Sequence, residues 1–341
     1  MYNLKYKYNK NDFPDMDVFL KNLYKRSCQY YLETNQDIPS IERRKDLESI
    51  YKFVNYTEDY IFGLVKLGFV NSANIDDVLT ELKKIQSISV LPKNLRGLFG
   101  VTTPDYRIAI NPNLNSSKYL TSEERTLLYI GHEVGHIIHK MWVDDIDMYI
   151  KNLRSSNNSI GHLLANFSLA NQYCISEGVS LLDEATVQEA AEAVTYHISK
   201  KERPPFVEHK HPKIYNGESY SSNFDYYSEL EEPAILFGRT LRGVGEINDY
   251  SSQRIIKDLT KKSFSKDFIT SIIDEYKVTP VLEEDFFYTM LCLGRIKDAS
   301  YGLFGKGNFS DSTSLSQKYF SNLKFLSKKN EDFRAEAAKK I

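Results

Sequence analysis

The sequence predicts an α+β protein that is predominantly helical and contains one small sheet. Apolar side chains recur at helical spacing over most of the 341 residues. Between residues 87 and 110 the pattern changes to short runs with β-branched residues, separated by a turn signal. Because a single core rarely grows past roughly 250–300 residues, a chain of this length is expected to form more than one compact region.

The N-terminal part is predicted to form three helices. Residues 14–35 and 40–67 carry apolar side chains at helical intervals, and residues 75–86 open with two aspartates. Acidic side chains are favourable in the first turn of a helix, because the exposed backbone amides give that end a partial positive charge. We interpret residues 1–86 as an N-terminal helical region.

A small sheet is predicted to follow. Residues 88–91 form a short run with two β-branched side chains. Residues 98–103 and 107–110 flank Pro104-Asp105, a pair that is typical of turns. The last two runs therefore predict a hairpin.

A helix from about residue 122 to residue 142 comes next. Thr121 and Glu124 have the spacing of a capping box, in which each side chain accepts a hydrogen bond from the backbone amide of the other residue. Apolar residues between Leu127 and Met141 then form one stripe along the helix. This stripe indicates that one face of the helix packs into a core.

The remainder of the chain is predicted to be mostly helical. Residues 161–200 are helical, most clearly at 181–200, and a long loop with three prolines covers residues 202–222. Further helices are predicted near residues 224–242, 252–275, 282–298 and 315–340.

Composition excludes several classes of protein. The formal net charge is −2, so the charge balance does not call for nucleic acid or an anionic membrane as a partner. The three cysteines are far apart and odd in number, and no disulfide framework is expected. The sequence shows no secretory signal and no apolar run of about 18 residues, so no membrane span is expected. We therefore expect a cytoplasmic protein.

The candidate site lies on the predicted helix 122–142, in the run His132-Glu133-Val134-Gly135-His136. Residues four apart on a helix differ by about 40° in direction and 6 Å in height, so two imidazole nitrogens converge on one ion. Zinc takes such nitrogens at about 2.0–2.1 Å. Glu133 points to one side, where it is badly placed to ligate and well placed to take a proton from a zinc-bound water.

A third ligand is expected further along the chain. The run DEATVQ at residues 183–188, together with HEVGH, resembles the glutamate zincins, the thermolysin-like class of metallopeptidases, over roughly residues 97–200. The resemblance implies Glu133 as the general base of peptide hydrolysis. It also implies one zinc ion with three protein ligands, namely His132, His136 and Glu184.

By the same resemblance, residues 87–205 form a zincin-like catalytic core. The helix pattern of the remaining residues predicts a C-terminal helical region over residues 206–341 that begins with the long loop. The substrate is expected to be a peptide or protein. Such peptidases hold an extended substrate against a sheet edge, a role open to residues 98–103 or 107–110. The alternative function is a catalytically weak or inactive zincin-like protein with an interaction or regulatory role.

Two features depart from that ligand set or compete with it. Gln188 stands where the class has a carboxylate that accepts a hydrogen bond from a ligating imidazole, and an amide polarises the ring less. Glu177 is the alternative third ligand, because it lies seven residues before Glu184 and shares its face on a continuous helix. Gly178 lies between them and indicates an interrupted helix, which favours Glu184.

A peptidase also needs a donor to the oxyanion, usually His, Tyr or Arg. We take Tyr227 as the candidate, because its segment opens a helix directly after the long loop. The other candidate donors to the oxyanion are Tyr226, His197, His209, His211 and Arg239.

His139 lies about 10.5 Å along the helix axis from His132. This distance predicts a packed or supporting side chain rather than a metal ligand.

Overall fold

The computed structural model describes residues 15–95, 97–144, 151, 155, 166–203, 228–242, 249–278, 283–301 and 309–339. The chain forms two compact units. The first comprises residues up to Lys140 together with Val187–Pro204, and the second comprises Met141–Thr186 together with the residues from Pro205 onward. The division of the chain into residues 1–86, 87–205 and 206–341 stays a prediction from the sequence pattern and the resemblance.

The three predicted N-terminal helices are present in the first unit. They are α1 (Met16–Thr34), α2 (Ser40–Lys66) and α3 (Ile75–Lys83). Their apolar stripes are buried, as the periodicity predicts: Leu23 on α1 and both Ile50 and Tyr60 on α2 have no exposed surface. Helix α3 ends before residue 86 because the chain turns into the sheet directly after it.

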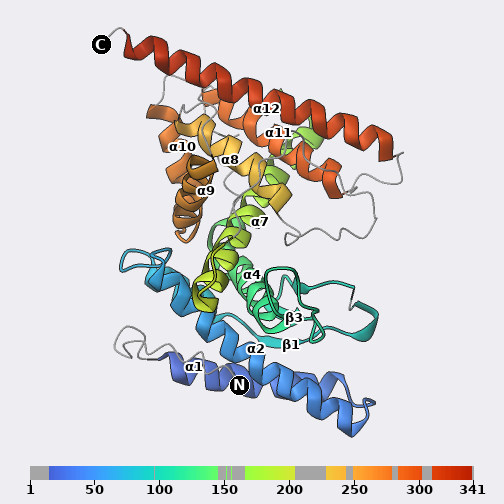
Figure 1. Ribbon diagram of the computed structural model, residues 1–341. Coiled ribbons are helices and arrows are strands. Elements are labelled where there is room, and N and C mark those ends of the chain that lie inside the picture. The colour runs from blue at the N-terminus through green and yellow to red at the C-terminus, as the bar shows by residue number, and fades with distance from the viewer. Residues whose placement is uncertain are drawn as a thin grey trace. The chain divides into compact units, whose positions relative to one another are not determined.

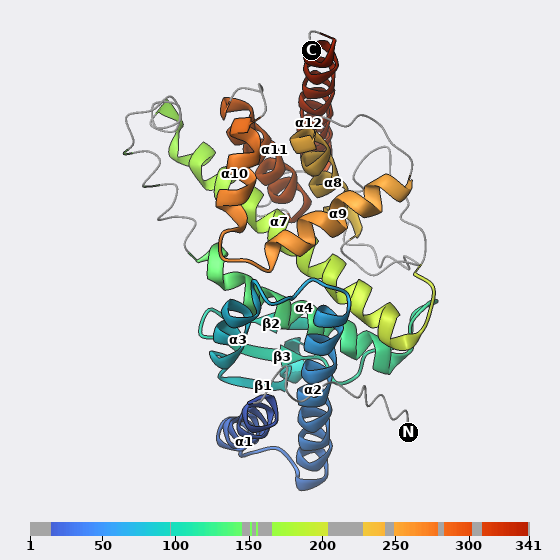
Figure 2. The same ribbon diagram turned by 90° about the vertical axis from the view of Figure 1, so that its left-hand side faces the viewer.

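The predicted sheet has three strands, β1 (Ser87–Val90), β2 (Gly100–Thr102) and β3 (Arg107–Ile110), in the order β1-β3-β2. Strands β1 and β3 are parallel, and β2 and β3 form the predicted antiparallel hairpin. Tyr106 takes a positive φ of 63° in the turn. In Figure 2 the strand β1 lies nearest α1, and β2 lies nearest the helix that carries HEVGH.

The two edges of this sheet differ. Side chains of α1 close the β1 edge, because Arg26 donates to the carbonyl of Ile85 and Ser27 accepts from the amide of Ile88. The outer edge of β2 pairs with no other strand in the part of the chain that the structure describes. The prediction that residues 107–110 can hold a substrate is wrong, since β3 is paired on both sides.

Helix α4 (Ser122–Val143) confirms the predicted helix 122–142. Both hydrogen bonds of the capping box form: the amide of Thr121 donates to Oε2 of Glu124 at 2.7 Å, and the amide of Glu124 donates to Oγ1 of Thr121 at 3.3 Å. The apolar stripe is buried, with Ile130, Val134 and Ile137 fully covered. The cap fixes where the helix begins and therefore which face carries the two histidines.

The second unit is helical. In Figure 1 the helices α11 and α12 lie side by side. The predicted helix 252–275 is wrong as one element, because a turn at Ser265 divides it into two helices. The helices of this part are α8 (Ser228–Arg242), α9 (Asp249–Ser263), α10 (Phe268–Val278), α11 (Glu283–Tyr301) and α12 (Phe309–Ala338).

The core of this unit contains the only tryptophan of the chain. Trp142 is 3% exposed, and its ring packs against Phe268 with the centroids 4.8 Å apart. Its Nε1 donates a 2.8 Å hydrogen bond to the carbonyl of Ser263, the last residue of α9. This bond satisfies one of the carbonyls that a helix C-terminus leaves without an intrahelical partner.

Helix α7 (Leu169–Ser199) is continuous, so the prediction of an interruption at Gly178 is wrong. The glycine has a different role. A side chain at Gly178 would overlap the main-chain oxygen of Met290 on α11, and one at Gly294 on α11 would overlap the main-chain oxygen of Cys174 on α7. Two backbones that approach so closely require residues without a Cβ on both helices.

Candidate metal centre

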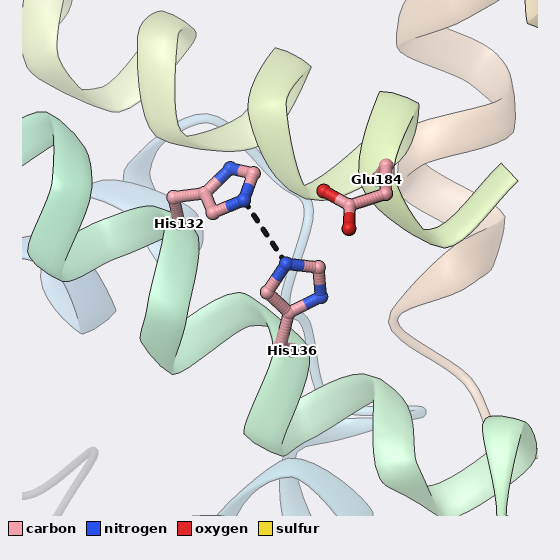
Figure 3. Close-up of side chains that lie close together, drawn as sticks. All are labelled: His132, His136 and Glu184. Atoms are coloured by element: carbon pink, nitrogen blue, oxygen red, sulfur yellow. Dashed lines mark hydrogen bonds between the residues drawn. The ribbon is translucent and has the colours of Figure 1, made fainter. Parts of the chain in front are cut away.

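The side chains of His132, His136 and Glu184 lie together. One ligand atom from each residue can be chosen so that all three atoms lie within 4.8 Å of one another. Figure 3 shows both imidazole rings of α4 turned toward α7 and the Glu184 carboxylate of α7 turned toward the rings. These three residues are the ligand set that the sequence predicts.

The two histidines converge through the same ring atom. Nε2 of His132 and Nε2 of His136 lie 3.0 Å apart, and the rings stand almost perpendicular at 88°. Ligand atoms at 2.0–2.1 Å from a tetrahedral zinc ion are about 3.3 Å apart. The spacing of the two nitrogens therefore fits a shared zinc ion after a displacement of a few tenths of an ångström.

Gly135, between the two histidines, allows α7 to approach. A Cβ at this position would lie 2.9 Å from Cγ1 of Val187, closer than side chains pack. Further along, Nζ of Lys201 donates to Oε2 of Glu124 in the first turn of α4. Residue 187 thus lies beside residue 135 and residue 201 beside residue 124, so α7 runs antiparallel to α4.

Glu133 lies on a different side of α4, against the sheet. Oγ1 of Thr102 donates a 2.6 Å hydrogen bond to Oε2 of Glu133, and a Cβ at Gly100 would lie 2.6 Å from Oε1. The side chain of Glu133 is largely buried, with 6% of the residue exposed. The edge strand β2 therefore both leaves room for the carboxylate and holds it.

Strand β2 continues along α4 on either side of this contact. Phe99, before β2, stacks on Tyr129 with the ring centroids 4.6 Å apart. Nζ of Lys140 donates to the carbonyls of Thr103 at 3.3 Å and Pro104 at 2.8 Å. The strand and the helix consequently run in the same direction, with Glu133 near the middle of the contact.

Comparison with protein-family models, with curated proteins and with solved structures gave no match. The arrangement of the residues themselves therefore carries the functional argument. In the part of the chain that the structure describes, none of the helices combines the length and apolar character needed to cross a membrane.

The other predicted site residues separate into three groups. Glu177 is on α7 but outside the metal cluster, and His139 is fully buried as a packed side chain. His197 is exposed in the last turn of α7, about 20 Å along the axis from Glu184, and Arg239 on α8 is 2% exposed. The predicted oxyanion donor Tyr227 lies outside the described residues, as do Tyr226, His209 and His211.

Sequence reasoning missed three residues near the site. Thr102 donates to Glu133, Glu192 accepts from Gln188, and Arg203 donates to Glu192. Only the contact between Gln188 and Glu192 is predictable from the sequence, because residues four apart on a helix are neighbours. The other contacts join segments that are far apart along the chain.

Proposed function

We propose that the chain is a zinc-dependent metallopeptidase with a zincin-like core. The observation that carries the proposal is the position of Glu133: its carboxylate is held by the edge strand β2, on the helix that supplies His132 and His136. A metal site, a general base and an unpaired strand edge are the three parts that hydrolysis of an extended peptide needs. The resemblance of HEVGH and DEATVQ to the glutamate zincins supports the same reading.

The residues divide the chemical work. A bound zinc ion polarises a carbonyl group and lowers the pKa of water to near 7. Glu133 accepts the proton from the attacking water and passes it to the leaving amine, as one carboxylate serves in both steps. The hydrogen bond from Thr102 to Oε2 holds the carboxylate in one orientation, and Oε1 would accept the proton.

The substrate would add to the sheet as a fourth strand. A peptide that pairs antiparallel with β2 lies along α4 and runs opposite to it, because β2 and α4 run in the same direction. Its main chain then passes Glu133 where Gly100 and Thr102 contact that residue. In this proposal Tyr227 remains the donor to the oxyanion.

The metal site is tested first. Purified wild type, Glu184→Ala and the matched control Glu177→Ala are loaded with zinc, and the metal content is measured by elemental mass spectrometry. We expect about one zinc per chain in the wild type and in Glu177→Ala, and a large loss in Glu184→Ala. A wild type that retains no zinc would remove the proposal. A loss of zinc in Glu177→Ala alone would show that Glu177, and not Glu184, is the third ligand.

Peptidase activity is tested on the zinc-loaded protein. We expect turnover of a broad peptide library by the wild type and loss of turnover in Glu133→Gln, which keeps the shape of the side chain and removes the base. Zinc content should be the same in both. A zinc-loaded wild type that cleaves no peptide would favour the alternative, a zincin-like protein with an interaction or regulatory role.

A further inference from the structure

Gln188 follows Glu184 by one turn of α7 and is completely buried. Its Nε2 donates a 2.7 Å hydrogen bond to Oε1 of Glu192, one turn further on. This bond turns the NH₂ group of the amide toward Glu192 and its carbonyl oxygen away from Glu192. Its Oε1 is buried and accepts no hydrogen bond from the residues that the structure describes.

Glu192 is held in turn by Arg203, which follows the end of α7. The Nε and Nη2 atoms of Arg203 donate to Oε2 of Glu192 at 3.0 and 2.6 Å, and Nη1 donates to Glu189. The Glu192 side chain is 14% exposed and that of Glu189 is 4% exposed. Two largely buried carboxylates therefore share one guanidinium, an arrangement in which charge-assisted bonds are strong.

The orientation of the helices places Gln188 on the His132 side of the metal cluster. Helix α7 runs antiparallel to α4, and Val187 lies beside Gly135. A residue that follows Val187 on the face of Glu184 is displaced along α4 toward His132. His132 is 2% exposed and Gln188 has no exposed surface, so both side chains are shielded from water.

We propose that Arg203 and Glu192 are positioning residues for the metal site. They hold the amide of Gln188 with its NH₂ group turned away, which leaves its carbonyl oxygen to accept from Nδ1–H of His132 when the ion is bound. That bond selects the tautomer whose Nε2 lone pair faces the ion. The two atoms, Oε1 of Gln188 and Nδ1 of His132, do not bond each other in this structure. The inference rests on the proposed metal site and does not depend on which substrate is cleaved.

The network also explains why residue 188 is an amide. A carboxylate at this position would lie 2.7 Å from Oε1 of Glu192 with no proton between them, and like charges at that distance repel strongly. Gln188→Glu, which restores the carboxylate of the zincin pattern, is therefore expected to weaken zinc binding. The double variant Gln188→Glu, Glu192→Gln restores one donor and one acceptor and is expected to recover it.

Zinc affinity, measured by competition with a chromophoric chelator, tests the inference without a substrate. We expect Arg203→Met and Gln188→Glu to bind zinc roughly 10–100-fold more weakly than the wild type. Arg203→Lys should recover only part of the loss, because a lysine lacks the planar fork. Lys201→Met is the matched control, a nearby cation that pairs with Glu124, and its affinity should not change.

The visible absorption spectrum of the cobalt-loaded proteins adds a readout of ligand geometry. It should change in Arg203→Met and return in the double variant, which general destabilisation would not produce. Arg203→Met with wild-type affinity and spectrum would overturn the inference, as would tighter zinc binding by Gln188→Glu. A wild type that binds zinc but cleaves no peptide removes the proposed function alone, whereas one that binds no zinc removes both.

Discussion

Thr102 and Glu133 are joined by a hydrogen bond of 2.6 Å between Oγ1 and Oε2, although 31 positions of the chain separate them. Oγ1 of Thr102 also lies 3.1 Å from the main-chain oxygen of Glu133. The hydroxyl thus holds the candidate base to the strand that the substrate would extend. A substrate that pairs with β2 and shifts this strand would therefore move the Glu133 carboxylate through the side chain of Thr102.

Replacement of this hydroxyl tests its role. Thr102→Val keeps the shape of the side chain and removes the donor, so we expect unfolding to become easier by about 1.5 kcal/mol. Peptide turnover should fall by a factor on the order of 10, because the carboxylate loses its fixed orientation. Denaturant unfolding and kcat are the measurements. Thr102→Ser should behave like wild type, and a valine variant with unchanged kcat would contradict the role.

Gly135 is expected to resist the smallest possible enlargement. Alanine usually stabilises the interior of a helix by about 1 kcal/mol relative to glycine. Gly135→Ala should nevertheless destabilise the protein by about 1–3 kcal/mol, since the new methyl group would lie 2.9 Å from Val187. It should also weaken zinc binding, because α7 carries Glu184. Gly97→Ala meets nothing within 4 Å and serves as the control for both measurements.

Gly178 should be still less tolerant. Its added methyl group would overlap the main-chain oxygen of Met290, which cannot rotate away. We expect Gly178→Ala to lower the free energy of unfolding by about 3 kcal/mol, measured by chemical denaturation. Gly238→Ala is the comparison in the same unit: its methyl group meets side-chain atoms of Ile255 and Leu259, so the loss should be smaller.

The raised pKa of Asp59 on α2 is expected to make the stability of the protein depend on pH. Burial, and then the Glu58 carboxylate, raises the pKa of Asp59 to about 7. An unfolded aspartate titrates near 4, so between about pH 4 and pH 7 the folded state holds a proton that the unfolded state lacks. Stability from this group is therefore present at pH 4 and lost as the pH rises through 7.

Asp59→Asn removes the ionisation. The variant should be more stable than the wild type at pH 8, and the difference should shrink steadily toward pH 4, as measured by urea unfolding at each pH. Glu58→Gln should move the midpoint of this effect to lower pH, because one of the two causes is gone. A difference between Asp59→Asn and wild type that does not vary with pH would rule out the assignment.

Much of the fold follows from local signals. The capping box and apolar stripe of α4 predict its ends to within one residue, because both act between residues on neighbouring turns. The division between α9 and α10 was not predictable. The carbonyl of Ser263 at that division is satisfied by the indole of Trp142, which is 121 positions away.

The candidate site was predicted to a similar extent. The two histidines of HEVGH were predictable as a pair, because the i and i+4 spacing on a helix alone brings their imidazoles together. Glu184 required the resemblance to a family. The sequence does not show that Gly178 stays within α7 and lies against the main chain of α11. Neither Thr102 nor Arg203 has a local signal, because each acts on a residue that only the folded chain brings near.

The buried position of Trp142 gives this chain an intrinsic optical probe of one unit. It is the sole indole, it is shielded from water, and it hydrogen-bonds a helix end within the second unit. Its fluorescence should be blue-shifted in the native state and should report the melting of that unit alone, whereas far-ultraviolet circular dichroism reports helices throughout. Curves from the two signals that fail to coincide would reveal a partly unfolded species, and the emission would identify which unit had melted.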